Sequence, residues 1–292
     1  MSRYDVAIVV SRESLPPVED DRLLYDECVK LGLQTGFVPW DDETFDWSGT
    51  AAAVLRSTWD YADRPREFAL WLDKVKEMTV LWNDPALVAD NADKRYLQRL
   101  NDIGIPTVPT VYCRTVEETV RAAEETDAPD VVLKPSCSAA GRRTYRLRRD
   151  DRAALLHSAA EIAAGSTVMV QPFLPEIKEE GEISAIFIDG AFTHFIRKRP
   201  SADGFMVQPA HGGTEGLTDV VGWEELQFCR NVIRQIGGGR LLFARVDYVL
   251  VRRSPVLMEL ELIEPDLFLR FSRSAAKRLA AALARRVGRL QG

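Results

Sequence analysis

Three acidic residues interrupt two apolar segments near the end of the chain. Glu259 and Glu261 stand two residues apart in segment 257–265, which otherwise has the character of a buried strand. Because successive side chains of a strand point to opposite faces, this spacing puts both carboxylates on one face. The preceding apolar segment, 241–251, carries Asp247. A tight turn between the two segments would place Asp247 opposite residue 259, 260 or 261, depending on its length.

Burying these carboxylates side by side is costly unless a cation compensates their charge. Oxygen atoms are the ligands that Mg²⁺ prefers in proteins, and acids are otherwise disfavoured at strand centres. We therefore predict that Asp247, Glu259 and Glu261 hold one or two Mg²⁺ ions. The alternative is that the three acids pair with nearby arginines.

Two lysines could bind phosphate groups. Lys134 ends an apolar strand and is followed by a loop of small residues over 136–143. The backbone N–H groups of such a loop can hold phosphates, which favours phosphate as the partner of Lys134 over a structural carboxylate. Lys94 is expected in the first turn of a helix over 94–103, where a positive charge opposes the helix dipole. That placement indicates a task other than helix stability.

A proline-broken strand follows in the sequence. The strand over 167–171 breaks at segment 172–175, which leaves backbone N–H and C=O groups free to read the edge of an adenine. One of the glutamates that follow could bind ribose hydroxyls, while most of them would be solvated. These glutamates are Glu176, Glu179, Glu180 and Glu182.

Basic and glycine-rich segments complete the set. A hairpin with an Asp189–Gly190 turn, a strong turn signal, ends in a basic cluster that contains Arg197 and Lys198. A loop further on contains Gly212 and Gly213. Together with the acids and lysines, these segments predict a site for Mg²⁺ and a polyphosphate, in which arginines stabilise charge on the γ-phosphoryl group.

The elements that must position these groups begin with alternating strands and helices. Strands are expected at 6–10, 37–40 and 51–55, and helices at 20–31 and 65–76, so the first 80 or so residues form an open parallel α/β layer. Ligands of such sheets bind beyond the carboxyl ends of the strands. Arg56 follows the third strand and could anchor a substrate carboxylate or phosphate. It could equally be a surface arginine that pairs with Asp60.

Composition excludes several classes of function. The chain has 292 residues and a net charge of −6 spread along its length, so nucleic acid is not an expected partner. Its four cysteines and three histidines show no zinc-ligand spacing. No apolar run is long enough to cross a bilayer, and no signal peptide precedes the first strand, so we expect a cytoplasmic protein. No dinucleotide-binding or P-loop motif is present.

The combination resembles the ATP-grasp superfamily in its glutathione-synthetase-like branch, over residues 83–270. Glu259-x-Glu261-x-x-x-Pro265 is similar to the E-x-N-x-x-x-P pattern of that family. The resemblance implies an α/β ATP-grasp fold in which two α+β subdomains, 91–175 and 176–292, enclose the nucleotide. It also implies an N-terminal substrate domain over 1–90.

The same resemblance assigns roles to single residues. It makes Asp247 a metal ligand with Glu259 and Glu261. Glu261 replaces the usual Asn, and Met206 stands where glutathione synthetases carry an arginine that contacts phosphate. One of Arg197, Lys198 and Arg270 would then supply that charge. The implied nucleotide-binding residues are Lys94, Lys134, Ser138, Gly141, Gln171, Pro172, Phe173, Leu174, Glu182, Gly212 and Gly213.

The resemblance implies a carboxylate–amine ligase or cyclase that uses ATP and Mg²⁺, or Mn²⁺, and passes through an acyl phosphate. Its partners would be a small acid and an amine, or one molecule carrying both, and a homodimer is one expected assembly. Residues 56–61 also resemble a subgroup of natural-product enzymes, among them one that closes the cycloserine ring from O-ureidoserine. This makes Arg56, Trp59 and Asp60 expected substrate contacts. A phosphotransferase and a nucleotide-binding protein of weakened activity are the alternatives.

Overall fold

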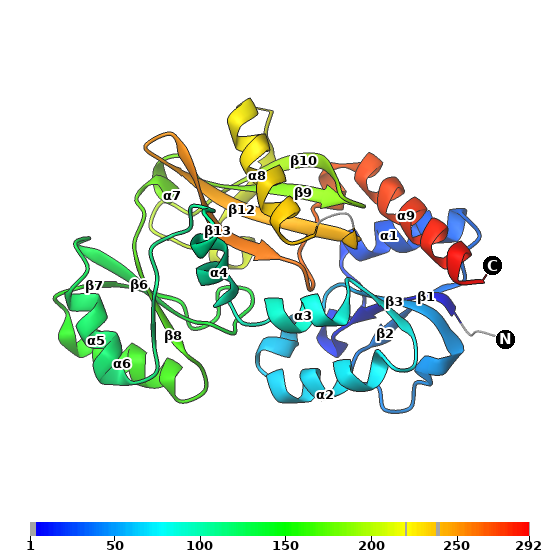
Figure 1. The fold of residues 1–292 in the computed structure, drawn as a ribbon, viewed down its shortest axis with the longest axis horizontal. Coiled ribbons are helices and arrows are strands. Elements are labelled where there is room, and N and C mark those ends of the chain that lie inside the picture. Colours follow the sequence, from blue (N-terminus) through cyan, green and yellow to red (C-terminus); the bar gives the residue numbers. More distant parts are fainter. Residues whose placement is uncertain (1–3, 220, 238–239, 292) are drawn as a thin grey trace.

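The computed structural model describes residues 4–219, 221–237 and 240–291. Three sheets organise this part of the chain (Figure 1). The first is parallel, with strand order β2-β1-β3-β4, and the mixed α/β class expected from the sequence is confirmed. Its strands are β1 (Tyr4–Val10), β2 (Thr35–Pro39), β3 (Thr50–Leu55) and β4 (Val80–Trp82).

Helices cover this first sheet. They are α1 (Glu19–Lys30), α2 (Pro65–Val75) and, from the far end of the chain, α9 (Arg273–Gln291). Helix α9 packs along α1 and also contacts β9 of another sheet (Figure 1). One apolar core therefore joins residues of the first sheet to the last helix, with Val6, Val54 and Leu279 among its members.

The second sheet is antiparallel and has the order β5-β8-β6-β7. It consists of β5 (Val111–Cys113), β6 (Asp130–Pro135), β7 (Tyr145–Arg148) and β8 (Val168–Pro172). Helices α5 (Val116–Glu124) and α6 (Arg152–Ala163) cover one face, at the left of Figure 1. Helix α5 begins with a capping box between Thr115 and Glu118, which satisfies backbone N–H groups that the first turn leaves unpaired.

The third sheet carries the predicted acids. Its order is β11-β10-β9-β12-β13, and its neighbouring strands are antiparallel. The strands are β9 (Glu182–Ile188), β10 (Ala191–Arg199), β11 (Thr214–Leu217), β12 (Phe243–Val251) and β13 (Ser254–Glu261), with α7 (Glu176–Glu179) and α8 (Trp223–Gln235) beside them. Asp189 and Gly190 both have positive φ, so the predicted two-residue turn is confirmed.

Strand β13 lies at a sheet edge, yet side chains and a connector satisfy its outer groups. The Tyr96 hydroxyl accepts from the Leu260 N–H at 2.9 Å and donates to the Leu260 carbonyl at 2.8 Å. The Asn91 amide accepts from the Leu262 N–H at 2.9 Å. Leu257 pairs with the connector at Pro106 and Val108. The edge that presents the acids is therefore fixed in place.

Two short helices supply these contacts, and one differs from expectation. Helix α3 (Pro85–Asn91) is capped by Asp84 and was not predicted. Helix α4 (Tyr96–Asp102) begins two residues after Lys94, so the prediction that Lys94 lies in the first helical turn was wrong. The Asp93 carboxylate accepts from the Arg95 N–H at 3.0 Å, which favours a turn there. The helix-dipole argument for Lys94 does not apply.

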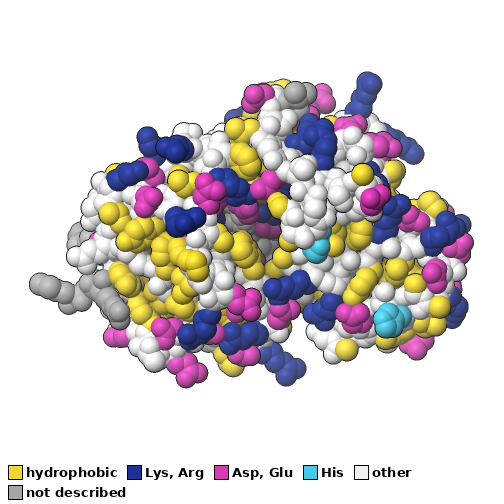
Figure 2. All heavy atoms as spheres, turned by 180° about the vertical axis from the view of Figure 1, so that it is seen from behind, with side chains coloured by type: hydrophobic (Ala, Val, Ile, Leu, Met, Phe, Trp, Pro, Cys, Tyr) yellow, Lys and Arg dark blue, Asp and Glu magenta, His cyan; other side chains and the backbone are white. Residues whose placement is uncertain are grey.

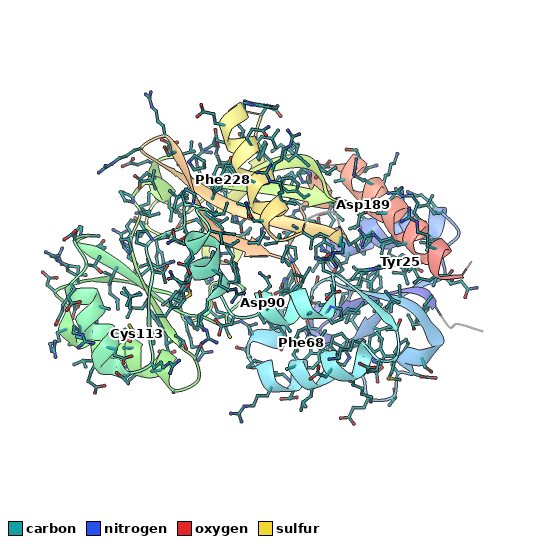
Figure 3. All side chains as sticks on the ribbon, viewed as in Figure 1. Tyr25, Phe68, Asp90, Cys113, Asp189 and Phe228 are labelled. Carbon is teal, nitrogen blue, oxygen red and sulfur yellow. The ribbon has the colours of Figure 1, made fainter. Side chains whose placement is uncertain are left out.

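Apolar cores lie under each sheet. In Figure 3, Tyr25 and Phe68 mark the two faces of the first sheet, Cys113 the core of the second and Phe228 the helix-covered face of the third. Short 3₁₀ helices connect the larger elements at Arg12–Ser14, Trp47–Gly49, Trp59–Ala62, Pro209–His211 and Leu269–Phe271. The predicted domain boundaries at residues 90 and 175 stay predictions.

Arg56 ties the first sheet to the loop after β13. It is 2% exposed, and its Nε donates to Asp21 at 3.0 Å while Nη1 donates to the Pro265 carbonyl at 2.9 Å. Asp21 is fully buried and also accepts from the Ser57 hydroxyl. This is a buried ion pair whose loss would leave a carboxylate without a counter-ion.

We predict that Arg56→Met lowers the free energy of unfolding by about 3–5 kcal/mol, because the buried Asp21 loses its ion-pair partner. The double variant Arg56→Met/Asp21→Leu should recover much of that loss. Denaturant unfolding measures both. If Arg56→Met kept full stability but raised the KM of a substrate, Arg56 would be the substrate anchor expected from the sequence rather than a structural cation.

We also predict acid sensitivity from His194 on β10. Burial lowers the pKa of His194 to about 4, whereas an unfolded histidine titrates near 6.5. The unfolded state therefore gains a proton first, and up to about 3 kcal/mol of stability is lost as pH falls from about 6.5 to about 4. His194→Gln should show a shallower decline in unfolding free energy over this range. Parallel pH profiles for the two proteins would contradict the assignment.

Candidate active site

A cavity of about 440 Å³ lies between the second and third sheets. Charged side chains of both signs are interspersed over the molecular face shown in Figure 2. The cavity wall contains most of the residues predicted to bind nucleotide and metal. These are Lys94, Lys134, Ser138, Gly141, Gln171, Pro172, Phe173, Leu174, Glu182, Glu259 and Glu261.

The acids lie opposite one another as the strand pattern predicted. Asp247 pairs with Glu259 and Arg245 with Glu261 in the β12–β13 register. A register shift between Asp247 and Tyr248 selects residue 259 from the three positions that the sequence allowed. Glu259 and Glu261 face the cavity, with side chains 28% and 22% exposed, whereas the Asp247 side chain is 2% exposed.

Each of these carboxylates faces a cation. Lys94 Nζ lies 3.0 Å from Glu259 Oε1, and Arg245 contacts both Glu261 and Asp247. Lys198 Nζ lies 3.5 Å from Asp247 Oδ1. Burial alone would raise the pKa of Asp247, but Arg245 and Lys198 outweigh it and hold that pKa below its usual range. Burial raises the pKa of Glu261 well above its ordinary value despite Arg245.

The donor chemistry fits Mg²⁺ at two of the three acids. Glu259 and Glu261 offer adjacent oxygen ligands to the cavity. Asp247 lies behind them, and its oxygens accept from Arg245 and Ser184. Within the described ranges, no three carboxylate, thiol or imidazole groups come together closely enough to hold a metal ion. The metal role of Asp247 stays a prediction and requires it to release a partner.

The two lysines differ in their partners. Lys94 donates to the Ser138 carbonyl as well as pairing with Glu259. Burial alone would lower the pKa of Lys94, but the negative charge of Glu259 outweighs it and keeps the pKa of Lys94 raised. Burial lowers the pKa of Lys134. No described residue forms a hydrogen bond or ion pair with the Lys134 ammonium group. It is therefore the cation of the cavity wall best placed to receive an anionic ligand.

The small-residue loop closes one side of the cavity. Gly141 has a φ of +71°, and a Cβ there would lie 3.0 Å from the Met206 sulfur. Met206 itself lines the cavity. The Met206 thioether therefore packs against the small-residue loop, at the position where glutathione synthetases carry an arginine. This contact makes that side of the cavity apolar.

The proline-broken segment forms another wall. Strand β8 ends at Pro172, and Phe173, Leu174 and Ile177 present apolar surface to the cavity. Arg146 lies over the Phe173 ring, 3.7 Å from its centroid. This wall has the flat apolar character that a nucleotide base requires. Glu182 also lines the cavity, but it pairs with Lys198.

Several predicted residues lie outside the cavity wall. Arg197 donates to the Glu180 carbonyl at 2.7 Å, and Lys198 is buried between Glu182 and Asp247. Arg270 pairs with Asp20, Asp266 and Glu215. Lys198 and Arg270 neutralise acids of the protein and Arg197 is held at a backbone carbonyl, so the structure does not bring these three cations to the place where phosphate charge was expected.

Gly212 and Gly213 and two of the three expected substrate residues, Arg56 and Asp60, also lie outside the cavity wall. A Cβ on Gly213 would lie 2.1 Å from the Val207 carbonyl oxygen, so this glycine permits a close backbone contact. The wall is formed by the residues just before Gly212 and Gly213 rather than by the glycines. Trp59 lines the cavity as expected, whereas Asp60 accepts from Trp40 at 2.9 Å outside it. Arg56 is buried in its ion pair with Asp21.

The sequence reasoning missed two charged residues of the wall, Arg245 and Asp266. Arg245 lies two residues before Asp247 on the same strand, so the period-two argument used for the glutamates would have placed both on one face. Glu264, which lies just beyond the end of β13, also lines the cavity, at 7% exposure. Burial raises its pKa to about 7.

A second hollow, of about 930 Å³, lies between β4 and α9 and contains none of the predicted site residues. Among the described residues, no helix is long and apolar enough to cross a membrane.

Comparisons with known proteins agree with this geometry. Residues 6–83 match the family described as the N-terminal domain of D-cycloserine synthetase DcsG. Residues 94–267, more than half of the chain, match the ATP-grasp domain of prokaryotic glutathione synthetase. The cycloserine biosynthesis protein DcsG of Streptomyces lavendulae is 32% identical, over 97% of this chain and 98% of its own. The glutathione synthetase of Bradyrhizobium diazoefficiens is 24% identical, over 61% of this chain and 55% of its own.

Solved structures show the same fold. The crystal structure of D-cycloserine synthetase DcsG superposes with a TM-score of 0.86 at 30% identity, covering 97% of this chain and 99% of that one. The ATP-grasp ligase PsnB, complexed with minimal precursor, Mg and ADP, superposes with a TM-score of 0.64 at 16% identity, covering 97% and 98%. The chain is therefore an ATP-dependent ligase of the ATP-grasp family, whose members use ATP and Mg²⁺, and its N-terminal domain is of the D-cycloserine synthetase type.

Proposed function

We propose that this enzyme activates the carboxylate of a small amino-acid-like substrate as an acyl phosphate, which an amine or similar nucleophile then attacks. ATP would lose its γ-phosphoryl group to the carboxylate, leaving ADP, and the nucleophile would expel inorganic phosphate. The nucleophile belongs either to a second substrate or to the same molecule. The 32% identity to a cycloserine biosynthesis protein over nearly the whole chain favours ring closure within one molecule.

One observation carries the proposal: the cavity holds adjacent acids and cations on one polar wall and an apolar wall beside it. Glu259, Glu261 and Lys94 form the polar wall with Lys134, and Phe173 belongs to the apolar one. Such a site can hold a nucleotide by its base and its phosphates at once. Among the described residues, the cavity wall has no Ser–His or Cys–His pair, so transfer depends on positioning and charge neutralisation.

The residues divide the work by charge. Glu259 and Glu261 would hold Mg²⁺, which when bound neutralises phosphate charge and orients the transferred group. Lys134 would contact phosphate oxygens. Arg245 would supply the positive charge that Met206 does not, because its guanidinium lies in the cavity wall beside Glu261. This charge supports an active ligase over a nucleotide-binding protein of weakened activity.

The product of the reaction tests the proposal against a phosphotransferase. Purified enzyme is incubated with ATP, Mg²⁺ and O-ureidoserine or a panel of amino acids, and ADP, phosphate and organic products are measured. We expect ADP and free phosphate in equal amounts with a new amide or ring product. A stable phosphorylated product would exclude the ligase, and absence of turnover across the panel would favour nucleotide binding alone.

We predict that Glu259→Gln lowers Mg·ATP turnover by about 10²-fold or more, because one oxygen charge at the metal is lost. The isosteric side chain should keep the thermal unfolding midpoint close to that of the wild type. Glu224→Gln, which removes an exposed acid from the first turn of α8, is the matched control. Unchanged turnover in Glu259→Gln would contradict the assigned role of the acids.

A further inference from the structure

Glu264 is a buried carboxylate that the proposed reaction has not used. It follows β13 directly, is 7% exposed and lines the cavity. No described residue donates a side-chain hydrogen bond to it or approaches it as an ion-pair partner, and only its own backbone N–H reaches the carboxylate. Lys94 and Arg245 attract this charge only from beyond ion-pair distance, so it lacks the directly paired cation that its neighbours Glu259 and Glu261 have.

The backbone at Glu264 is held from the first sheet. Trp59 Nε1 donates to the Glu264 carbonyl at 3.3 Å, and Arg56 Nη1 donates to the next carbonyl, that of Pro265, at 2.9 Å. Arg56 is itself fixed by Asp21. The side chain therefore projects from a rigid segment, which is how proteins present a ligand-binding group.

Aromatic side chains share this part of the wall. Trp59 and Tyr61 line the cavity, and Ile263 contributes apolar surface. Burial and then the charge of Glu264 raise the pKa of Tyr61 well above its ordinary value, which keeps its hydroxyl neutral beside the carboxylate. Aromatic faces together with an uncompensated carboxylate attract organic cations. Lys94, the nearest lysine of the wall, is already engaged by Glu259 and Ser138.

We propose that Glu264, with Trp59 and Tyr61, forms the subsite that binds the ammonium group of the amino-acid-like substrate. The ammonium group would serve as the counter-ion of Glu264. This pairing would orient the substrate carboxylate toward the nucleotide side of the cavity. The inference rests on the proposed function, since it takes this cavity as the reaction site. It assigns the residues that recognise the amino group of that substrate.

Two probes test the subsite, one with a free amino group and one in which acetylation removes its charge and adds bulk. O-ureidoserine and its N-acetyl derivative are titrated by calorimetry into enzyme that holds Mg²⁺ and a non-hydrolysable ATP analogue. We expect the wild type to bind the amino form at least about tenfold more tightly than the acetylated form, as a buried ion pair requires. Glu264→Gln should reduce this preference to less than about threefold, and Glu264→Asp, which keeps the charge, should retain most of it.

Controls separate charge recognition from structural damage. Glu179→Gln, on the exposed surface of α7, should keep the wild-type preference. Circular dichroism and thermal unfolding midpoints check that each variant is folded. If Glu264→Gln does not fold, the affinity preference for the amino form, measured in Glu264→Asp and in the wild type, still tests the proposal. Equal binding of the two probes by the wild type, binding of neither, or an undiminished preference in Glu264→Gln would overturn the proposal.

ADP release measured in parallel distinguishes the two proposals. An enzyme that binds the amino probe in a Glu264-dependent manner but produces no ADP with any acceptor would disprove the proposed reaction and leave the ammonium subsite standing. An enzyme that produces ADP but binds the two probes with equal affinity would disprove the ammonium subsite and leave the proposed reaction standing.

Discussion

Charge compensation at the β12–β13 pair is the constraint on which the rest of the structure depends. Three carboxylates lie on adjacent strands beside the cavity, and each meets a cation from a different part of the chain. Lys94 comes from the connection before α4, Lys198 from β10 and Arg245 from β12 itself. Without these partners the carboxylates would take up protons or the strands would separate. The fold can be understood as the arrangement that delivers these cations while leaving one side of the acids open.

The same constraint explains why an edge strand can carry the acids. An edge with unpaired N–H and C=O groups would move or recruit another strand. Here Asn91, Tyr96 and the connector at residues 106–108 satisfy those groups. Asn83 adds bonds to Phe243 and Leu262 from the end of β4. The polar wall of the cavity is thus rigid, whereas the loop over 136–143 contacts it through few groups, among them the Ser138 carbonyl at Lys94.

Local patterns predicted the parts of the structure that local physics controls. The period of two placed Glu259 and Glu261 on one face, and the Asp189–Gly190 dipeptide specified its turn. Most of the nucleotide- and metal-binding residues that the family pattern predicted lie in the cavity wall. The family pattern did not reveal that Arg270 forms ion pairs with Asp20, Asp266 and Glu215, because such pairs join residues up to 250 positions apart. The predicted helix began too early, at Lys94, because the Asp93 side chain stabilises a turn there. The spacing of apolar residues, from which the helix was predicted, does not detect such a turn.

The packing of α9 on α1 has a consequence for how the protein is made. The first sheet leaves the ribosome early, but the apolar surface that α9 covers stays exposed until the last helix has been synthesised. The two ends of the described chain consequently lie near each other in Figure 1. Contacts between such distant segments slow folding and expose intermediates to aggregation. The first sheet therefore reaches its final packing only once α9 has been synthesised.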